Sequence, residues 1–387
     1  MATTSPAAIL ARHIRRGDRV AYGDGAGTPL SLGGPLAEAA AGVGEVSLLL
    51  GWSLELSIQV DRDVFADVAS IIGGYALRAP LREGRVRYLP ARLGTMPALL
   101  HGPLQVDHII AGVRPARGGG YVFGSEVGWM RAAVDSGATV LAEVNHSLPD
   151  ATDGVVLPED RVVIASEVHR PPIARRRARS TPEAEKIGRF VADLIPEGAS
   201  VQFGPGLVGE VVLASLQVPV RIHSGVLTDA VVDLDERGLL LDDPVSTYLA
   251  GSELLYRWAD GKPILAPVEQ THDLSRLSQL PLFAINTALE IDRTGQVNVE
   301  GIDGDVIAGV GGHPDFAAGA SRSPTGLSVV ALPTVRGSQP TLVDALSAPT
   351  STTRSDVDVV VTEHGVADLR PLDDRQRARA LETLWNA

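Results

Sequence analysis

The chain has 387 residues, 44% of them hydrophobic and 21% charged, and this length predicts two domains rather than a single core. The absence of cysteine excludes disulfides, thiolate metal sites and a cysteine nucleophile. A net charge of −13 argues against a nucleic-acid-binding protein. No apolar run approaches the roughly 18 residues of a membrane span, so we expect neither nucleic acid nor a membrane as a partner.

The histidines and the N-terminal residues bear on metal binding and location. The 9 histidines are scattered, without HxxxH or HExxH spacing, so we expect no metal site. Near the N-terminus the basic residues follow the first apolar stretch, whereas in a signal peptide they precede it. We therefore expect a cytoplasmic protein.

The beginning of the chain is repeated near its middle. ARHIRRGDRVAYGDGAG and VADLIPEGASVQFGPGL both predict a helix, a turn glycine, a strand and a glycine-rich loop. Five pairs of matching residues share an offset of 181 positions, among them Gly17 with Gly198 and Gly25 with Gly206. Matches at one offset predict a duplicated α/β domain.

Short β-branched runs then alternate with helical patterns through both halves. VSLLLGW, VDHIIAGV and TVLAEVNH lie in the first half, and LSVVALP and VDVVVTEHG in the second. Such continuously apolar strands are typical of parallel sheets covered on both faces. FAINTALEIDRTGQVNVE instead alternates on either side of residues 293–295, which predicts a hairpin.

A boundary is expected near residue 180. The run of arginines at 175–177 and 179 is typical of a solvated linker, although a phosphate contact is the alternative, and Ser180-Thr181-Pro182 predicts a helix start. We therefore predict α/β domains at residues 1–180 and 181–387, each with a mostly parallel sheet.

Two glycine clusters are candidates for ligand binding. Gly204 to Gly209 matches GxGxxG after a strand, but the acid that a dinucleotide site needs about 20 residues later is replaced by His223-Ser224-Gly225. We therefore disfavour NAD, while glycines at this place still allow backbone amides to approach an anion or an oxyanion. GVGGHPDF, residues 309–316, is the second cluster and is also suited to close backbone approach.

Several segments together resemble one family. IRRGDRVAYGDGAGTPL, RYLPARLGTMPALL, ALEIDRTGQVNVE, GVGGHPDFAAGA, SVVALPT and VVVTEHGVADLR occur in this order. The ordered set resembles the acetyl-CoA hydrolase/transferase family of class I CoA-transferases, which includes 4-hydroxybutyrate CoA-transferase. The resemblance covers nearly the whole chain. It implies two tandem CoA-transferase-type domains with the active site between them, a homodimer, and coenzyme A or acyl-CoA as substrate together with an acceptor.

The resemblance also implies roles for particular residues. The second cluster matches the family's GxGGxxDF segment, which lines the CoA thioester and supplies amides to an oxyanion hole, and the 204–206 loop matches another loop facing the thioester. The implied CoA contacts are Gly309, Gly311, Gly312, His313, Asp315, Phe316, Gly204 and Gly206, and the implied acyl-substrate contacts are Gly25, Ala26, Gly27, Ser224 and Gly225.

One position departs from the family in a way that changes the chemistry. The stretch IHSGVLTDAVVDL matches the family pattern H-[ST]-E, whose glutamate is the nucleophile and forms acyl-glutamyl and glutamyl-CoA intermediates. Gly225 stands at that position, and glycine has no side chain with which to form either intermediate.

Three hypotheses follow. The chain is an acyl-CoA enzyme that hydrolyses or transfers the acyl group directly, with a general base among His223, Glu126, Glu210 and Glu363. Alternatively it is a CoA-transferase with a relocated carboxylate such as Glu126, or a non-catalytic acyl-CoA-binding protein or partner subunit. His223 and His313 are ambiguous individually, because each is equally consistent with a structural role. We expect Glu363 to serve packing rather than chemistry.

Overall fold

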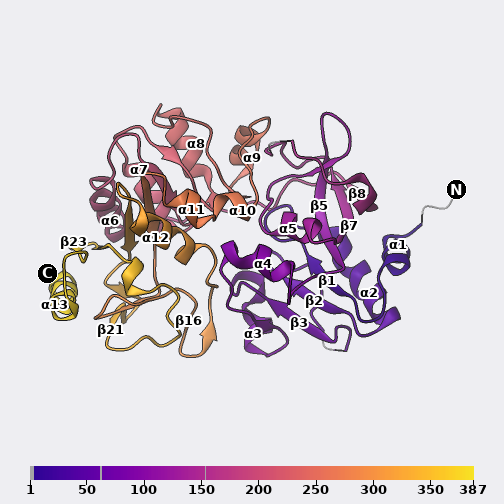
Figure 1. Cartoon of the computed structure of the whole chain (residues 1–387), viewed down its shortest axis with the longest axis horizontal. Coiled ribbons are helices and arrows are strands. Elements are labelled where there is room, and N and C mark those ends of the chain that lie inside the picture. The colour runs from indigo at the N-terminus through magenta and orange to yellow at the C-terminus, as the bar shows by residue number, and fades with distance from the viewer. Residues whose placement is uncertain (1–3, 62, 153) are drawn as a thin grey trace. The chain divides into compact units, whose positions relative to one another are not determined.

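The computed structural model describes residues 4–61, 63–152 and 154–387, and the chain forms two compact units (Figure 1). Unit 1 comprises residues 1–91, 95–174 and 247–269, and unit 2 comprises residues 92–94, 175–246 and 270–387. The predicted boundary at 180 lies close to the crossover at 174–175. The prediction did not include the return of residues 247–269 to unit 1 or the assignment of 92–94 to unit 2.

Backbone hydrogen bonds explain both exceptions. The amides of Val127 and Val268 donate to the carbonyls of Thr247 and Gly128, at 3.0 and 3.1 Å, which ties the returning segment to unit 1. The Leu93 amide donates to the Gly311 carbonyl at 3.0 Å, which ties residues 92–94 to unit 2.

The core of unit 1 is a sheet in the order β4-β3-β2-β1-β5-β7-β8, parallel throughout, with β6 antiparallel to β5 at its side. Helices α1 and α2 pack together, and the main apolar cluster of this unit includes residues of both. The strands are β1 (Arg19–Tyr22), β2 (Ser47–Leu50), β3 (Asp67–Ser70), β4 (Arg87–Tyr88), β5 (His108–Pro115), β6 (Tyr121–Phe123), β7 (Thr139–Asn145), β8 (Val162–Val168) and β12 (Tyr248–Leu249). The helices are α1 (Pro6–His13), α2 (Gly33–Val43), α3 (Arg78–Arg82), α4 (Met96–Leu100), α5 (Met130–Asp135) and α9 (Glu253–Ala259), and the chain enters unit 2 within α10 (Val268–Thr271).

The core of unit 2 is a sheet in the order β10-β9-β13-β18-β22-β23, in which only the pairing of β22 with β23 is antiparallel. Successive residues of β13 and β18 are all buried, so both faces of this sheet are covered. The strands are β9 (Ser200–Phe203), β10 (Arg221–Ile222), β11 (Val226–Leu227), β13 (Leu282–Asn286), β14 (Glu290–Asp292), β15 (Val297–Asn298), β16 (Gly301–Ile302), β17 (Asp305–Val306), β18 (Leu327–Ala331), β19 (Val335–Arg336), β20 (Gln339–Pro340), β21 (Leu342–Val343), β22 (Val359–Thr362) and β23 (Gly365–Asp368). The helices are α6 (Pro182–Ala192), α7 (Leu207–Ser215), α8 (Asp229–Glu236), α11 (Leu274–Leu277), α12 (His313–Arg322) and α13 (Asp374–Trp385).

The two sheets confirm the predicted duplication. β1 lies between β2 and β5, and β9, at the matching position of the repeat, lies between β10 and β13, all in parallel. The turn glycines Gly17 and Gly198 both have positive φ, +87° and +79°, which explains why this pair is glycine in both copies. The fold class predicted from the sequence, α/β with mostly parallel sheets, is therefore confirmed.

The predicted hairpin is confirmed for its second part only. β14 and β15 pair antiparallel around Gly295, whose φ is +94°. The preceding residues 282–286 instead form β13 in the parallel sheet, because their side chains are all buried and complete the sheet core between β9 and β18.

Candidate active site

The loop that contains Gly225 is fixed to the carboxyl end of β9. The His223 amide donates to the Val201 carbonyl at 3.0 Å, which continues the pairing of β10 with β9. The Ser224 hydroxyl donates to the Phe203 carbonyl at 2.9 Å, and Ser224 is fully buried. The Ser224 side chain therefore holds the loop in place, which fixes the backbone conformation at Gly225.

His223 reaches from this loop to the end of α10. Its Nε2 lies 3.0 Å from the Thr271 carbonyl oxygen, to which a protonated Nε2 donates. The ring lies edge-on to Phe316, with centroids 6.3 Å apart, and burial lowers the pKa of His223 below its ordinary value. These contacts give His223 a positioning role towards the segment 271–272.

His272 is a site residue that sequence analysis did not identify. Only 3% of its surface is exposed, its ring centroid lies 4.7 Å from that of Phe316, and its Nδ1 lies 2.8 Å from the Thr271 hydroxyl oxygen. Its Nε2 is buried and has no hydrogen-bond partner among the described residues. Burial, followed by repulsion from His223, lowers the pKa of His272 to about 3, so the imidazole is neutral at pH 7.

Two glycines flank this nitrogen. A Cβ built on Gly312 would lie 2.4 Å from His272 Nε2, so the ring can occupy its place only because residue 312 has no side chain. A Cβ built on Gly225 would lie 3.4 Å from both His272 Nε2 and the Phe316 ring. A side chain at residue 225 would therefore begin at an ordinary contact distance from the unpartnered nitrogen.

The second glycine cluster leads into the start of α12. Gly311 has φ +58°, and the helix begins at His313, so the cluster presents first-turn amides. His313 Nδ1 lies 2.7 Å from the Thr352 hydroxyl oxygen, and burial lowers the pKa of His313 to about 4. Asp315 accepts the Gly94 amide at 2.9 Å, and burial raises its pKa to about 6.

Gly309 is half-buried at the beginning of the cluster at residues 309–316.

The loop at residues 204–206 follows β9 directly and is more open than that cluster. No heavy atom lies within 4 Å of a Cβ built on Gly204 or Gly206. By contrast, a Cβ on Gly209 would lie 2.2 Å from the Gly204 carbonyl oxygen, so this third glycine serves the packing of α7 on the loop. Packing therefore explains Gly209, whereas Gly204 and Gly206 leave their backbone accessible to a ligand.

Glu126 lies in unit 1 and is enclosed. It is 2% exposed, and the Gly27 amide and the Ser125 hydroxyl donate to Glu126 Oε2 at 3.0 and 2.9 Å. Burial raises the pKa of Glu126 to about 8. A Cβ on Gly25 or on Gly27 would lie 2.5 Å from a Glu126 oxygen, so these glycines make room for the carboxyl group. Ala26 is also buried.

Asp24 is buried beside this group. The Trp52 amide, the Trp129 indole and the Tyr248 hydroxyl donate to its Oδ2 at 3.0, 2.9 and 3.1 Å. Burial raises the pKa of Asp24 to about 6. The loop after β1 thus encloses two carboxyl groups, whereas the loop after β9 lies open.

The other two candidate bases have different surroundings. Glu210 is in the first turn of α7, where burial raises its pKa. The Glu363 carboxylate accepts the Thr334 amide, with Oε2 at 3.0 Å, and the Thr334 hydroxyl at 2.5 Å from Oε1, so both of its oxygens are engaged within unit 2.

The linker arginines pair within unit 2. Arg175 donates to the Pro205 carbonyl, and Arg177 forms an ion pair with Asp233 at 2.5 Å. The linker is therefore held against the unit rather than simply solvated.

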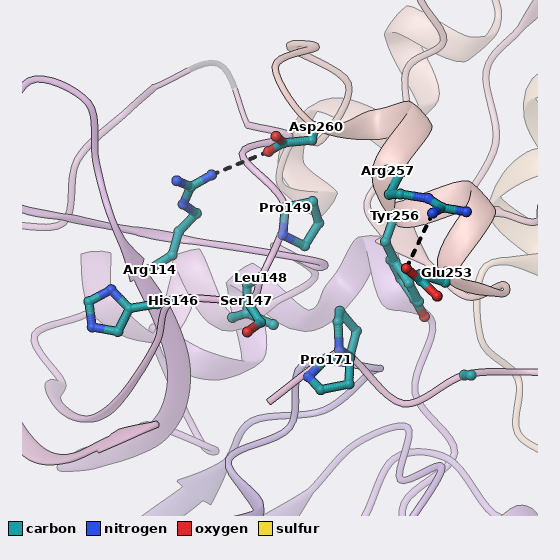
Figure 2. A pocket seen from close by; sticks show the side chains of 12 residues that line it. Arg114, His146, Ser147, Leu148, Pro149, Pro171, Glu253, Tyr256, Arg257 and Asp260 are labelled. Atoms are coloured by element: carbon teal, nitrogen blue, oxygen red, sulfur yellow. Dashed lines mark ion pairs between the residues drawn. The ribbon is translucent and has the colours of Figure 1, made fainter. Parts of the chain in front are cut away.

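Unit 1 also contains a cavity of about 690 Å³ that holds none of the predicted site residues (Figure 2). Its charged side chains are largely paired: Arg114 lies 3.6 Å from Asp260, and Arg257 lies 3.4 Å from Glu253. The residues that line it are Arg114, His146, Ser147, Leu148, Pro149, Pro171, Pro172, Ala174, Glu253, Tyr256, Arg257 and Asp260.

In the described part of the chain, no group of three or more His, Asp or Glu side chains is arranged to hold a metal ion. No helix there is both long enough and apolar enough to cross a membrane.

Fold and site together define a tandem α/β protein with glycine loops at the carboxyl ends of parallel strands, and comparison with known proteins identifies the family. The N-terminal domain of the acetyl-CoA hydrolase/transferase family matches residues 4–170, and its C-terminal domain matches residues 251–384. The 4-hydroxybutyrate coenzyme A transferase of Clostridium kluyveri is 31% identical over 338 residues, which are 82% of this chain and 78% of that protein. The chain belongs to the acetyl-CoA hydrolase/transferase family.

Two further relatives span nearly the whole chain. The butyryl-CoA:acetate CoA-transferase of Anaerostipes caccae is 28% identical, over 95% of this chain and 90% of that protein. The crystal structure of RipA from Yersinia pestis superposes with a TM-score of 0.88 at 25% identity, covering 98% of this chain and 93% of that one.

Proposed function

We propose that this protein is an acyl-CoA enzyme that transfers or hydrolyses the acyl group directly, without a covalent intermediate at residue 225. The observation that carries the proposal is Gly225 itself, because the loop follows β10 and is held as described above, yet it offers no carboxylate. In covalent catalysis, a carboxylate nucleophile first takes up the acyl group and so divides its transfer into two steps joined by a covalent intermediate.

The glycine loops supply the remaining chemistry. First-turn amides of α12 carry partial positive charge that is suited to a developing oxyanion on the thioester. The accessible backbone at Gly204 and Gly206 allows a second close approach. Preformed amides of this kind commonly contribute about 2.7–4 kcal/mol per donor to a transition state, so substantial activity can survive without the nucleophile.

The environment of Glu126 favours direct chemistry over transfer through a relocated carboxylate. Its surface is 98% covered, and its oxygens already accept an amide and a hydroxyl hydrogen bond. A nucleophile must instead present an oxygen to the substrate carbonyl.

The proposal further includes a cytoplasmic homodimer, as the resemblance and the N-terminal composition suggest, and light scattering on the purified protein tests the dimer.

The decisive experiment incubates the purified protein with acetyl-CoA and butyryl-CoA, with and without carboxylates and amines, and follows CoA species by mass spectrometry. Free CoA, or an acylated amine, without any acyl-enzyme adduct supports the proposal. New acyl-CoA species formed from added carboxylates contradict it and point to a relocated carboxylate, which Glu126→Gln then tests.

The Gly225→Glu variant is assayed in parallel with the unmodified protein. Its Cβ fits at 3.4 Å from its nearest neighbours, so the change restores a carboxylate with little disturbance at the backbone. We expect Gly225→Glu to introduce carboxylate-dependent formation of new acyl-CoA. Micromolar binding of acyl-CoA by the unmodified protein without any turnover overturns the proposal in favour of a binding protein.

A further inference from the structure

The position of a side chain at residue 225 borders an unsatisfied polar atom. A Cβ built there lies 3.4 Å from His272 Nε2, and this nitrogen has no hydrogen-bond partner among the described residues. A buried polar atom without a partner costs about 1–3 kcal/mol, so an atom of this kind beside the candidate site calls for a functional reason.

We propose that His272 Nε2 binds and deprotonates a water molecule beside Gly225, so that water is the acyl acceptor and the protein is an acyl-CoA thioesterase. This inference rests on the proposed function and deepens it, by naming the acceptor and the general base. It replaces the four candidate bases considered from the sequence with a fifth residue.

The enclosure of Nε2 favours water over a larger acceptor. His272 is only 3% exposed, so an acceptor that reaches its Nε2 must be small, and water is smaller than an amine with its carbon substituents.

The surroundings of the ring fit a base. Thr271 Oγ1 lies 2.8 Å from Nδ1, and in the tautomer that the proposal requires, Nδ1–H donates to it and leaves the Nε2 lone pair facing Gly225. His223 holds the Thr271 carbonyl, and Phe316 packs against the His272 ring, so both fix its orientation.

The ionisation of His272 is consistent with this role. Burial lowers its pKa to about 3, so the ring is neutral at pH 7 and, before the reaction begins, a weak base. An anionic tetrahedral intermediate next to the ring favours the imidazolium and raises that pKa as the reaction proceeds.

The step balances without any further reactant. The water oxygen forms a bond to the thioester carbonyl carbon while one water proton moves to His272 Nε2. The tetrahedral intermediate then collapses, the carbon–sulfur bond breaks, and the proton on Nε2 passes to the departing sulfur. The products are the carboxylic acid and the CoA thiol, and the imidazole returns to its neutral state.

The test compares His272→Asn and His272→Ala with the wild-type protein, using butyryl-CoA and acetyl-CoA. A general base contributes about 10²–10⁴-fold, so we expect kcat for hydrolysis to fall by that factor while KM changes less than about threefold. Imidazole added to His272→Ala should restore part of the rate and saturate, which a merely structural role would not produce. His101→Ala, a change at an exposed histidine of unit 1, is the matched control and should keep its rate with or without imidazole.

The outcomes separate the two proposals. Hydrolysis by the wild type together with a His272→Asn rate within about threefold of it overturns the role of His272 and leaves the proposed function standing. Acyl transfer to amines without hydrolysis overturns water as the acceptor, again leaving the proposed function. A wild type that turns over no acyl-CoA overturns both. If the variants do not fold, a wild-type single-turnover hydrolysis rate that is the same in D₂O as in H₂O contradicts proton transfer by any base.

Discussion

Glu126 in unit 1 and His272 in unit 2 are exposed by only 2% and 3%, and each lies against glycines of a loop. They differ in how their polar atoms are satisfied. The Glu126 carboxyl accepts an amide and a hydroxyl hydrogen bond, whereas His272 Nε2 has no partner among the described residues. A buried ionisable group with its donors in place stabilises one arrangement of the chain, whereas a buried ring nitrogen without a partner calls for a functional reason.

The glycines that lie against Glu126 and His272 also differ in the space around them. Gly25 and Gly27 have contacts that leave no room for a side chain, as has Gly312, whereas a Cβ on Gly225 would lie at an ordinary contact distance of 3.4 Å from its nearest neighbours. Substitutions at these positions test this difference, and the expected effect on the free energy of unfolding is largest for Gly25→Ala and smallest for Gly225→Ala.

The largest effect is expected for Gly25→Ala in unit 1. The new Cβ would lie 2.5 Å from Glu126 Oε2, and the backbone φ of +81° is itself unfavourable for alanine. Overpacking and backbone strain together should lower the free energy of unfolding by about 2–5 kcal/mol, measured by chemical denaturation. Gly34→Ala in α2, where no heavy atom lies within 4 Å of the new Cβ, is the control and should be neutral or stabilising. Equal stability of the two variants would contradict the close packing around Glu126.

Glu126→Gln should change how stability depends on pH. The pKa of Glu126 is raised from 4.5 to about 8 in the folded protein, so between these values the folded state keeps a proton that the unfolded state has lost. Stability therefore falls as pH rises through this window, and glutamine removes that fall. Between pH 5 and pH 8 the free energy of unfolding of the variant should gain about 2–4 kcal/mol relative to the wild type. Parallel stability curves for the two proteins would show that the carboxyl group is not held protonated.

Gly312→Ala should affect both stability and hydrolysis. Its Cβ would lie 2.4 Å from His272 Nε2, so the ring must move, and overpacking of this kind costs about 1–3 kcal/mol. Displacing the base should also lower kcat for butyryl-CoA hydrolysis by about 10²-fold or more. Denaturation and steady-state kinetics on the same preparation measure the two effects. An unchanged kcat in a destabilised variant would mean that the ring position is irrelevant to the reaction.

Gly225→Ala should have the smallest effect on stability and still a clear effect on the reaction. The methyl group fits at 3.4 Å from its neighbours, so the free energy of unfolding should change by less than about 0.5 kcal/mol. Because the methyl group lies 3.4 Å from His272 Nε2 and narrows the approach of water to it, hydrolysis should fall by about tenfold or more. Hydrolysis at the wild-type rate would show that the reacting water binds elsewhere.

Much of the fold follows from local sequence patterns. The matches between Gly17 and Gly198 and between the strands that follow them predicted the duplication, because a turn glycine with positive φ and a buried strand each leave a recognisable local signal. The hairpin at residues 290–298 was recognisable for the same reason, through its alternation around Gly295. The return of residues 247–269 to unit 1 left no such signal, because it depends on backbone hydrogen bonds to distant residues such as Val127.

The site shows the same limit. Sequence alone determined that residue 225 is a glycine, at a position where the resemblance predicts a glutamate, because the identity of a residue needs no folding to be read. Only the tertiary structure decided that His272 lies beside it, since α8 and α9 separate the two residues in the chain and the contact arises where the ends of α10 and β10 meet. It likewise decided that Glu126 is enclosed by Gly25 and Gly27, because burial is a property of the packed chain and not of any segment by itself.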